Sequence, residues 1–335
     1  MNTTHTLATA SVVICAYTLD RLDALVLAIE SVQRQSRQAS EIIVVIDHNP
    51  ELLQKIQARV ANAASNVVIV ENAERRGLSG ARNTGLSLAH GSIIAFMDED
   101  AQAASTWLER LIHCYDDASV AGVGGSIAPL WLSGRPKWFP AEFYWVIGCT
   151  YIGMPAQPAC VRNLIGCNMS FRKEVFEAVG GFRDGMGRIG TLPVGCEETE
   201  LCIRANQHWP QRRFVFDPGV EVINHRVPAT RACWRYFVSR CVGEGLSKAL
   251  VSNLVGTKDG LSAERTYVFN TLPAGIVKGV ADALLRGDAS GVTRAVAIIV
   301  GCLATTAGFV FGKVRGAIRN QRRPTSFSPP IQFKF

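Results

Sequence analysis

Three consecutive carboxylates stand at the end of an apolar run and offer the chemistry of a metal site. Asp98, Glu99 and Asp100 follow residues 92–97 (SIIAFM), a run too short and too rich in β-forming residues for a helix. The run predicts a buried strand with acids at its tip. Ligands of open α/β sheets bind at that edge. There, Asp98 and Asp100 can hold a hard divalent cation and leave positions for diphosphate oxygens. A solvated acidic turn is the alternative interpretation.

A second acidic cluster offers a base. Glu197, Glu198 and Glu200 lie in the motif CEETEL, at the predicted start of a helix near residue 197. The helix dipole favours acids in a first turn, which is one explanation for them. The chemical explanation is a general base, because a sugar hydroxyl that attacks an activated sugar must give its proton to a carboxylate. One cluster for a metal and one for a base would together serve such a transfer.

Three further features are less specific. Asp47 ends an early predicted strand, where it either caps the helix after Pro50 or contacts a nucleotide base or ribose. Residues 77–85 (GLSGARNTG) place glycines and Arg82 at a helix start, where backbone NH groups favour phosphate. The segment matches neither the Walker nor the dinucleotide fingerprint. His225 is either structural or a ligand that completes the shell of a borderline ion such as manganese.

The elements that must position these residues alternate along the first 130 residues. Apolar runs predict strands at 11–15, 42–46, 67–70 and 92–97, and helical periodicity predicts helices at 20–35, 52–60, 79–89 and from about 105. This βα alternation predicts a doubly wound, mostly parallel α/β sheet. The carboxyl ends of its strands would bring Ala16, Tyr17, Asp47, Glu71 and the DED cluster to one crevice.

The middle of the chain is less regular. Residues 129–160 combine prolines and glycines with aromatic residues, Trp138 among them, and predict a long surface loop. Such a loop shapes a binding site or simply packs. Helices are predicted at 168–178, from 197 and at 230–254.

The C-terminal part changes character. Residues 295–312 carry no charge and are only moderately apolar, near the lower length limit of a membrane span. Basic residues flank both ends, which disfavours a single span. We expect a re-entrant or in-plane helix held on anionic lipid by arginines. A buried C-terminal helix of a soluble protein is the alternative.

Composition limits the partners and the compartment. The 335 residues carry a net charge of +7, which favours an anionic partner, and no nucleic-acid-binding motif is present. Ten scattered cysteines without metal spacing indicate reduced thiols of a cytoplasmic protein. The first ten residues lack the basic and apolar stretches of a signal peptide.

The motifs together resemble those of a family 2 glycosyltransferase of the GT-A fold, membrane-associated subset. The matching pieces, in family order over about residues 10–230, are VVICAY, the strand end at Asp47, GLSGARNTGL, AFMDED, IGCNMSFRKEVFEAVGGF, CEETEL and INHRVP. The resemblance implies an inverting transferase that uses a nucleotide-diphosphate sugar and a divalent metal, Mn²⁺ or Mg²⁺. The absence of the QxxRW signature of processive synthases implies transfer of one sugar at a time.

The resemblance also implies roles for individual residues. Ala16, Tyr17, Asp47, Arg82, Asn83 and Asp98 would contact the donor, with Asp47 at the base. Asp98, Asp100 and His225 would hold the metal, with Asp100 the more direct ligand. Asn168 and Trp138 would line the sugar and acceptor site. Glu198 would be the base, although it replaces the usual Asp, so that Glu197 could reach the acceptor instead.

We therefore expect a catalytic domain over residues 1–230, with a nucleotide-sugar half (10–130) and an acceptor half (130–230), then a helical region over 231–335. Its acceptor would be a lipid-linked sugar or an envelope glycan at the cytoplasmic membrane face. Two other classes stay open at this point. A sugar nucleotidyltransferase would need a glycine-rich basic loop after the first strand, where VVICAYTLDR has neither glycine nor lysine. A non-catalytic sugar-nucleotide-binding protein would not need CEETEL.

Overall fold

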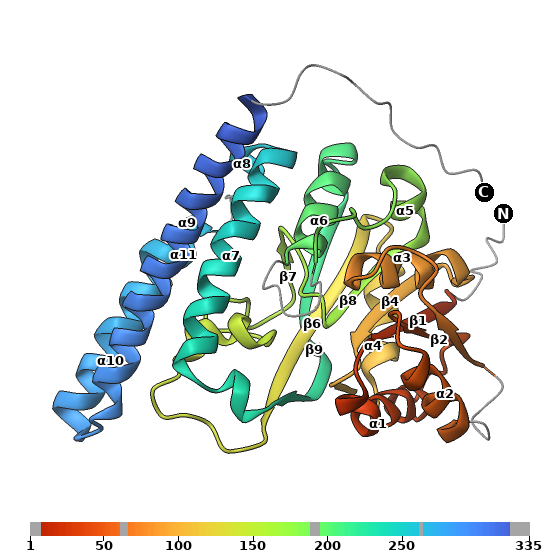
Figure 1. Ribbon diagram of the computed structural model, residues 1–335, viewed down its shortest axis with the longest axis horizontal. Helices are drawn as coiled ribbons and strands as arrows, with labels where there is room; N and C mark the ends of the chain where they lie inside the picture. Colours follow the sequence, from red (N-terminus) through yellow and green to blue (C-terminus); the bar gives the residue numbers. More distant parts are fainter. Residues whose placement is uncertain (1–7, 61–65, 188–194, 261–263, 322–335) are drawn as a thin grey trace.

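A computed structural model describes residues 8–60, 66–187, 195–260 and 264–321. Its amino-terminal half confirms the predicted alternation. Four parallel strands, β1 (Ala10–Ala16), β2 (Glu41–Ile46), β3 (Val67–Glu71) and β4 (Ile93–Asp98), lie in the order β3-β2-β1-β4. The helices α1 (Leu22–Gln33), α2 (Pro50–Arg59) and α3 (Leu78–Leu88) connect them. All four strands therefore end at one edge (Figure 1).

The sheet continues beyond β4 with antiparallel pairing. The strand β8 (Asn168–Arg172) runs antiparallel to β4 and to β6 (Val120–Trp131), and β9 (Arg213–Val227) runs parallel to β6. Short β5 (Gln102–Ala103) and β7 (Ala159–Val161) both pair with β9 and complete a mixed nine-stranded sheet. The helix α4 (Trp107–His113) follows β5, and α5 (Lys173–Val179) follows β8.

One prediction for the middle of the chain was wrong, and another was confirmed. The helix predicted over 168–178 begins only at Lys173, because the preceding five residues fill the gap between β4 and β6 as β8. The loop predicted over 129–160 is present, and its aromatic centre packs inward. It opens with the end of β6 and contains a 3₁₀ helix, η3 (Ala141–Ile147), and Phe139 and Phe143 are almost completely buried.

Helices follow the last strand and form one side of the molecule (Figure 1). They are α7 (Trp234–Val255), α8 (Thr257–Gly260), α9 (Glu264–Thr266), the π-helical η5 (Tyr267–Thr271), α10 (Leu272–Arg286) and α11 (Ser290–Gln321). One more helix, α6 (Glu197–His208), precedes β9. The helices α7 and α11 meet through their backbones. A Cβ atom on Gly245 would lie 2.0 Å from the carbonyl oxygen of Thr305, so only glycine permits this approach.

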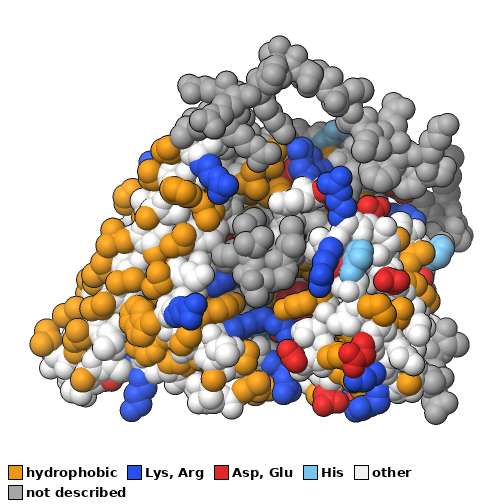
Figure 2. Space-filling model, in the orientation of Figure 1, with side chains coloured by type: hydrophobic (Ala, Val, Ile, Leu, Met, Phe, Trp, Pro, Cys, Tyr) orange, Lys and Arg blue, Asp and Glu red, His pale blue; other side chains and the backbone are white. Residues whose placement is uncertain are grey.

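The outer side of this helical wall is apolar. Among the described residues, the helical stretches Glu264–Arg286 and Ser290–Gly316 are long and apolar enough to cross a membrane, and only 22% and 28% of their apolar windows are buried. Figure 2 shows the apolar side chains gathered along the edge formed by these helices. Leu285 is 83% exposed and Leu303 is 65% exposed. This degree of exposure differs from that of a buried C-terminal helix, and the first of the two stretches was not predicted.

Candidate active site

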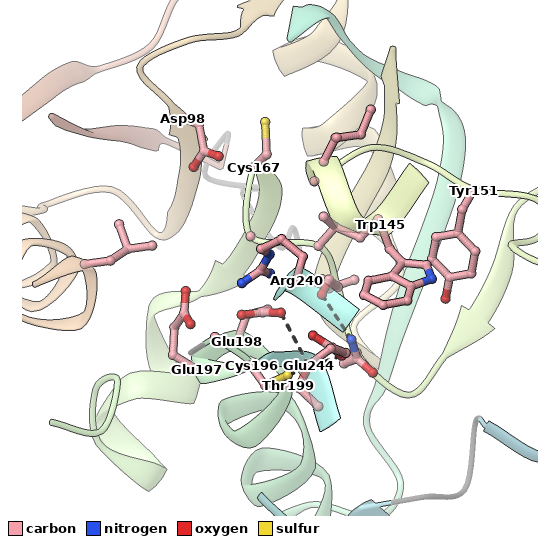
Figure 3. A pocket seen from close by; sticks show the side chains of 18 of the residues that line it. Asp98, Trp145, Tyr151, Cys167, Cys196, Glu197, Glu198, Thr199, Arg240 and Glu244 are labelled. Atoms are coloured by element: carbon pink, nitrogen blue, oxygen red, sulfur yellow. Dashed lines mark hydrogen bonds between the residues drawn. The ribbon is translucent and has the colours of Figure 1, made fainter. Parts of the chain in front are cut away.

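One cavity of about 620 Å³ joins the carboxyl edge of the parallel strands to the C-terminal helices. Three sets of residues line it. Strand ends and the following loops supply Ala16, Tyr17, Arg21, Asp47, Asp98, Glu99 and Asp100; α6 supplies Glu197 and Glu198; and α7 and α11 supply Arg240, Glu244, Lys248, Cys302, Thr305 and Thr306. Figure 3 shows Asp98 and Cys167 on one side of this pocket and Glu197 and Glu198 across from them.

A cluster of potential metal ligands lies at the tip of β4. Ligand atoms of Asp98, Cys167 and His225 lie within 4.8 Å of one another. The imidazole Nε2 of His225 lies 2.9 Å from the carbonyl oxygen of Ile147. Because a carbonyl only accepts, Nε2 carries the proton, and the lone pair on Nδ1 faces the cluster. Nδ1 lies 3.6 Å from the Cys167 sulfur and 3.4 Å from Oδ1 of Asp100.

The cluster concentrates groups that donate electron pairs. The Cys167 thiol is buried, and this burial, together with the negative charges of Asp98 and Asp100, raises its pKa well above the usual value. A thiolate at this position therefore needs a cation beside it. The donor set of carboxylate, imidazole and sulfur suits a borderline divalent ion.

The other two acids of the DED motif are bound by arginines. Arg21 lies 2.6 Å from Glu99 and 3.0 Å from Oδ2 of Asp100, and Arg231 lies 3.6 Å from the same Asp100 oxygen. Burial raises the pKa of Glu99 to about 7, against the opposing charge of Arg21. Asp98 is the most exposed of the three, with 32% of its side chain accessible. Access to a ligand in the cavity is thus greatest at Asp98.

Arg82 connects the two acidic clusters. Its guanidinium is buried and lies 2.5 Å from Glu197 and 3.9 Å from Asp98, and it donates a 3.1 Å hydrogen bond to the carbonyl oxygen of Gly166. Cys196 has a left-handed backbone (φ 68°) and turns the chain into α6, so that the first helical turn borders the cavity. Glu197 is thus held in a buried ion pair with Arg82.

The surroundings of Glu198 differ from those of Glu197. Its closest hydrogen-bond partner is the hydroxyl of Thr199, at 3.4 Å, and its side chain is partly exposed in the cavity. Burial in the protein, and then the neighbouring charge of Glu197, raise the pKa of Glu198 to about 8, while Arg82 acts in the opposite direction. A carboxylate with a raised pKa takes a proton more readily at neutral pH. Which of the two glutamates acts as the base stays a prediction.

Asp47 shapes the end of the cavity at which nucleotide binding is predicted. This buried carboxylate accepts hydrogen bonds from Asn72 Nδ2 (2.7 Å) and from the amide of Gly77 (3.0 Å), so it also holds the start of α3. One amide of the predicted phosphate-binding segment 77–85 is therefore occupied by protein. Tyr17 is 42% exposed and stands beside Arg21, whose guanidinium carbon lies 5.7 Å from the ring centroid.

Three predicted site residues do not line the cavity. Asn83 exchanges two 2.8 Å hydrogen bonds with the backbone of Phe182 and ties α3 to the chain after α5. Asn168 is completely buried, and its side chain bonds the indole of Trp107 and two backbone carbonyls. The side-chain amides of Asn83 and Asn168 thus form hydrogen bonds with backbone groups that burial would otherwise leave unpaired.

Trp138 is the third of these residues. Its ring stacks on Trp234 with 4.4 Å between centroids and meets the edge of Phe237 at 5.6 Å, which makes it part of the packing beneath α7. Glu200 of the CEETEL motif is also structural, because it is fully buried and forms ion pairs with Arg183 (2.6 Å) and Arg204 (2.9 Å).

Sequence reasoning missed the part of the cavity that α7 lines. Arg240, Glu244 and Lys248 follow one another at intervals of four, so they share one helical face, and this spacing was the signal available in the sequence. Lys248 lies 3.2 Å from Glu244 and 2.5 Å from Glu264. The sequence motifs of the family end near residue 230, before α7 begins, so they do not include this face of α7.

Comparisons with known proteins agree with this geometry. The family model of glycosyl transferase family 2 matches residues 11–180. A glucosyl-dolichyl phosphate glucuronosyltransferase of Haloferax volcanii is 30% identical over 303 residues, which are 90% of this chain and 95% of the relative. A UDP-Glc:alpha-D-GlcNAc-diphosphoundecaprenol beta-1,3-glucosyltransferase of Escherichia coli is 29% identical over 110 residues, 33% of this chain and 42% of that protein.

Solved structures share the fold. The mannosyltransferase PcManGT from Pyrobaculum calidifontis, in complex with GDP-Man and Mn²⁺, aligns with a TM-score of 0.55 at 18% identity and covers 88% of this chain and 86% of its own. GalNAc-T7 with UDP, GalNAc and Mn²⁺ aligns with a TM-score of 0.53 at 16% identity, over 79% and 57% of the two chains. The fold is thus GT-A, and the chain belongs to glycosyl transferase family 2 and is a glycosyltransferase.

Proposed function

We propose that this glycosyltransferase moves one sugar at a time, with inversion, from a nucleotide-diphosphate sugar to a hydroxyl of a lipid-linked acceptor. The observation that carries the proposal is the continuity of the cavity. It starts at the strand edge, passes Asp98 and Glu198, and ends at Thr305 on α11, the helix whose outer side is apolar. A donor site, a base and a lipid-facing helix are thereby joined in one space.

The donor end would bind the nucleotide beside Ala16, Tyr17 and Asp47. Asp98 and His225 would hold a divalent cation next to the diphosphate, with Asp100 behind them, and the Asp/Cys/His donor set fits such an ion. When bound, the cation supplies positive charge for the leaving diphosphate. Support comes from the two structural neighbours, which are both Mn²⁺ complexes. Arg21 and Arg82 add fixed positive charge on the same side of the cavity.

Glu198 would act as the base. The acceptor oxygen bonds to the anomeric carbon, its proton passes to Glu198, and the bond from that carbon to the diphosphate oxygen breaks with its electron pair leaving on the diphosphate. Attack from the face opposite the leaving group inverts the configuration. Arg82 forms an ion pair with Glu197, and the negative charge of Glu197 raises the pKa of Glu198.

The acceptor would approach along the C-terminal helices. The Haloferax relative is named for a dolichyl phosphate and the Escherichia relative for a diphosphoundecaprenol, and both are lipid-linked acceptors. In this chain, α11 has Cys302 and Thr305 in the cavity wall, while Leu303 between them is exposed. The helix α11 thus borders the cavity on one side and is exposed at the protein surface on the other.

The same helices would dock the enzyme on the cytoplasmic face of the cell membrane. The helix α11 packs along α7 and against α10, so the apolar residues of α10 and α11 that are exposed form one outer surface. Such a surface suits helices that lie in the membrane plane. Basic residues near the end of α11, Lys313 and Arg315, would strengthen binding to anionic lipid by about 1 kcal/mol each. The ten cysteines are free thiols, in keeping with a reducing compartment.

A transfer assay tests the proposal. Full-length protein in detergent is incubated with Mn²⁺, a panel of nucleotide sugars and a glycosylated polyprenyl phosphate, beside the same glycan without lipid. We expect transfer to the lipid-linked glycan with inverted anomeric configuration. Glu198→Gln should lose activity, whereas Glu221→Gln, a change at an exposed carboxylate outside the cavity, should retain it. Retained configuration, or transfer only to the soluble glycan, would contradict the proposal.

A further inference from the structure

We infer that Cys167 is a third protein ligand of the metal and that its thiolate makes the site prefer ions that accept nitrogen and sulfur ligands, Co²⁺ and Zn²⁺ above all, over Mg²⁺. The inference rests on the proposed metal role of Asp98 and His225. It assigns to this chain a softer donor set than two carboxylates would give.

The first support is convergence. The Cys167 sulfur and Nδ1 of His225 are 3.6 Å apart, and both lie within 4.8 Å of a carboxylate oxygen of Asp98. All three atoms are electron-pair donors. The hydrogen bond from His225 Nε2 to Ile147 leaves Nδ1 without a proton, so Nδ1 accepts from the Cys167 thiol when no cation is bound. A cation placed among them would satisfy all three.

The second support is that Cys167 is held in place. The carbonyl oxygen of Gly166, before it, accepts a hydrogen bond from Arg82. The amide side chain of Asn168, after it, donates to the carbonyl oxygens of Ser126 and Val220, at 3.0 and 2.8 Å. Cys167 is itself only 3% exposed. Neighbours fixed in this way position a metal ligand, and they give Asn168 a positioning role.

The third support is the engagement of the remaining carboxylate. One oxygen of Asp100 is bound by Arg21 and Arg231, so only its other oxygen, 3.4 Å from His225 Nδ1, faces the cluster. Mg²⁺ requires oxygen ligands in nearly ideal octahedral geometry. A site with imidazole and thiolate ligands instead binds Co²⁺ and Zn²⁺ more tightly than Mn²⁺. On binding, the thiol releases its proton to solvent and the sulfur pairs with the metal.

Cobalt spectroscopy tests the inference without donor, acceptor or turnover. Full-length protein in detergent is titrated with Co²⁺ alone, and the near-ultraviolet thiolate-to-cobalt charge-transfer band is recorded. We expect the band in the wild type and in Cys15→Ser, which removes another thiol lining the cavity. Cys167→Ser should lose the band. Calorimetry should show its Co²⁺ affinity lowered by about 10–100-fold, the order of loss for supporting groups in metal sites, with Mg²⁺ binding unchanged.

Two results would overturn the inference. The first is a wild type that binds Co²⁺ without the band, because Cys167 would then only pack beside the metal. The second is a band that persists in Cys167→Ser. A correctly folded Cys167→Ser, checked by circular dichroism, keeps the comparison valid. Failure of sugar transfer in the assay above leaves the spectroscopic result unaffected, so the two proposals fail separately.

Discussion

The strongest test of the proposed base is the pH dependence of turnover. Only the ionised form of Glu198 can accept a proton, and burial beside Glu197 raises its pKa to about 8. The pH profile of kcat/KM reports the pKa of groups in the free enzyme. With a pKa of about 8, about one-tenth of the enzyme is active at pH 7 and about nine-tenths at pH 9. We therefore expect kcat/KM to rise roughly tenfold between these values.

Two variants separate Glu198 from its neighbour. Glu198→Gln should lose about 10²–10⁴-fold in rate, the usual contribution of a general base, together with the pH dependence. Glu197→Gln removes the like charge next to Glu198 and releases the positive charge of Arg82. Both effects lower the pKa of Glu198, so the rising limb should move to lower pH.

The assay is initial-rate transfer at saturating Mn²⁺ from pH 6 to pH 9.5, with metal binding checked at each pH. The reasoning about Glu198 is refuted if the wild-type profile is flat above pH 7, or if Glu198→Gln keeps the same rising limb. A larger loss of rate in Glu197→Gln than in Glu198→Gln would assign the base to Glu197.

Three further outcomes are expected. Glu198→Gln should raise the melting temperature at pH 9 but not near pH 4, in calorimetric scans. The reason is that Glu198 has a higher pKa in the folded protein than in the unfolded chain. The folded protein therefore loses stability as the pH rises from about 4.5 to about 8. Asp98→Asn should abolish the Mn²⁺-dependent thermal stabilisation by UDP or GDP, which for the wild type at 100 times the dissociation constant amounts to about 2.7 kcal/mol. Leu303→Glu with Phe311→Glu should abolish sedimentation with anionic vesicles, because each side chain is more than 60% exposed on α11. The matched control carries the same change at two exposed leucines elsewhere, Leu88 and Leu132. An unchanged melting temperature of Glu198→Gln at pH 9 would contradict the buried charge. Retained stabilisation by UDP or GDP in Asp98→Asn would remove this residue from the metal site. Unchanged sedimentation of the double α11 variant would contradict the docking surface.

The sequence was sufficient for the parallel half of the fold because continuous apolar runs between helices specify buried parallel strands. It was insufficient for β8, where buried Asn168 and Ser170 alternate with Met169 and Phe171. Such polar residues enter a core only when partners satisfy them, and those partners come from β6, β9 and α4. Pairings of this kind cannot be read from local pattern.

The candidate site, like the fold, could be predicted only in part from the sequence. The acids at the ends of β4 and at the start of α6 were found because secondary structure alone places them at the cavity. Their separate roles depend on Arg21, Arg82 and Arg231, which meet them only after folding. Asn83 and Trp138 were assigned to ligands because their contacts with Phe182 and Trp234 involve distant parts of the chain.

The placement of α11 has a consequence for acceptor length. A single helix separates the exposed Leu303 from Thr305 in the cavity wall, and an α-helix with its side chains is about 10–12 Å across. If the outer side of α11 rests on lipid, the reacting hydroxyl must stand at least this far above the membrane. The helix would therefore set a minimum length for the part of the acceptor that extends from the lipid to the reacting hydroxyl.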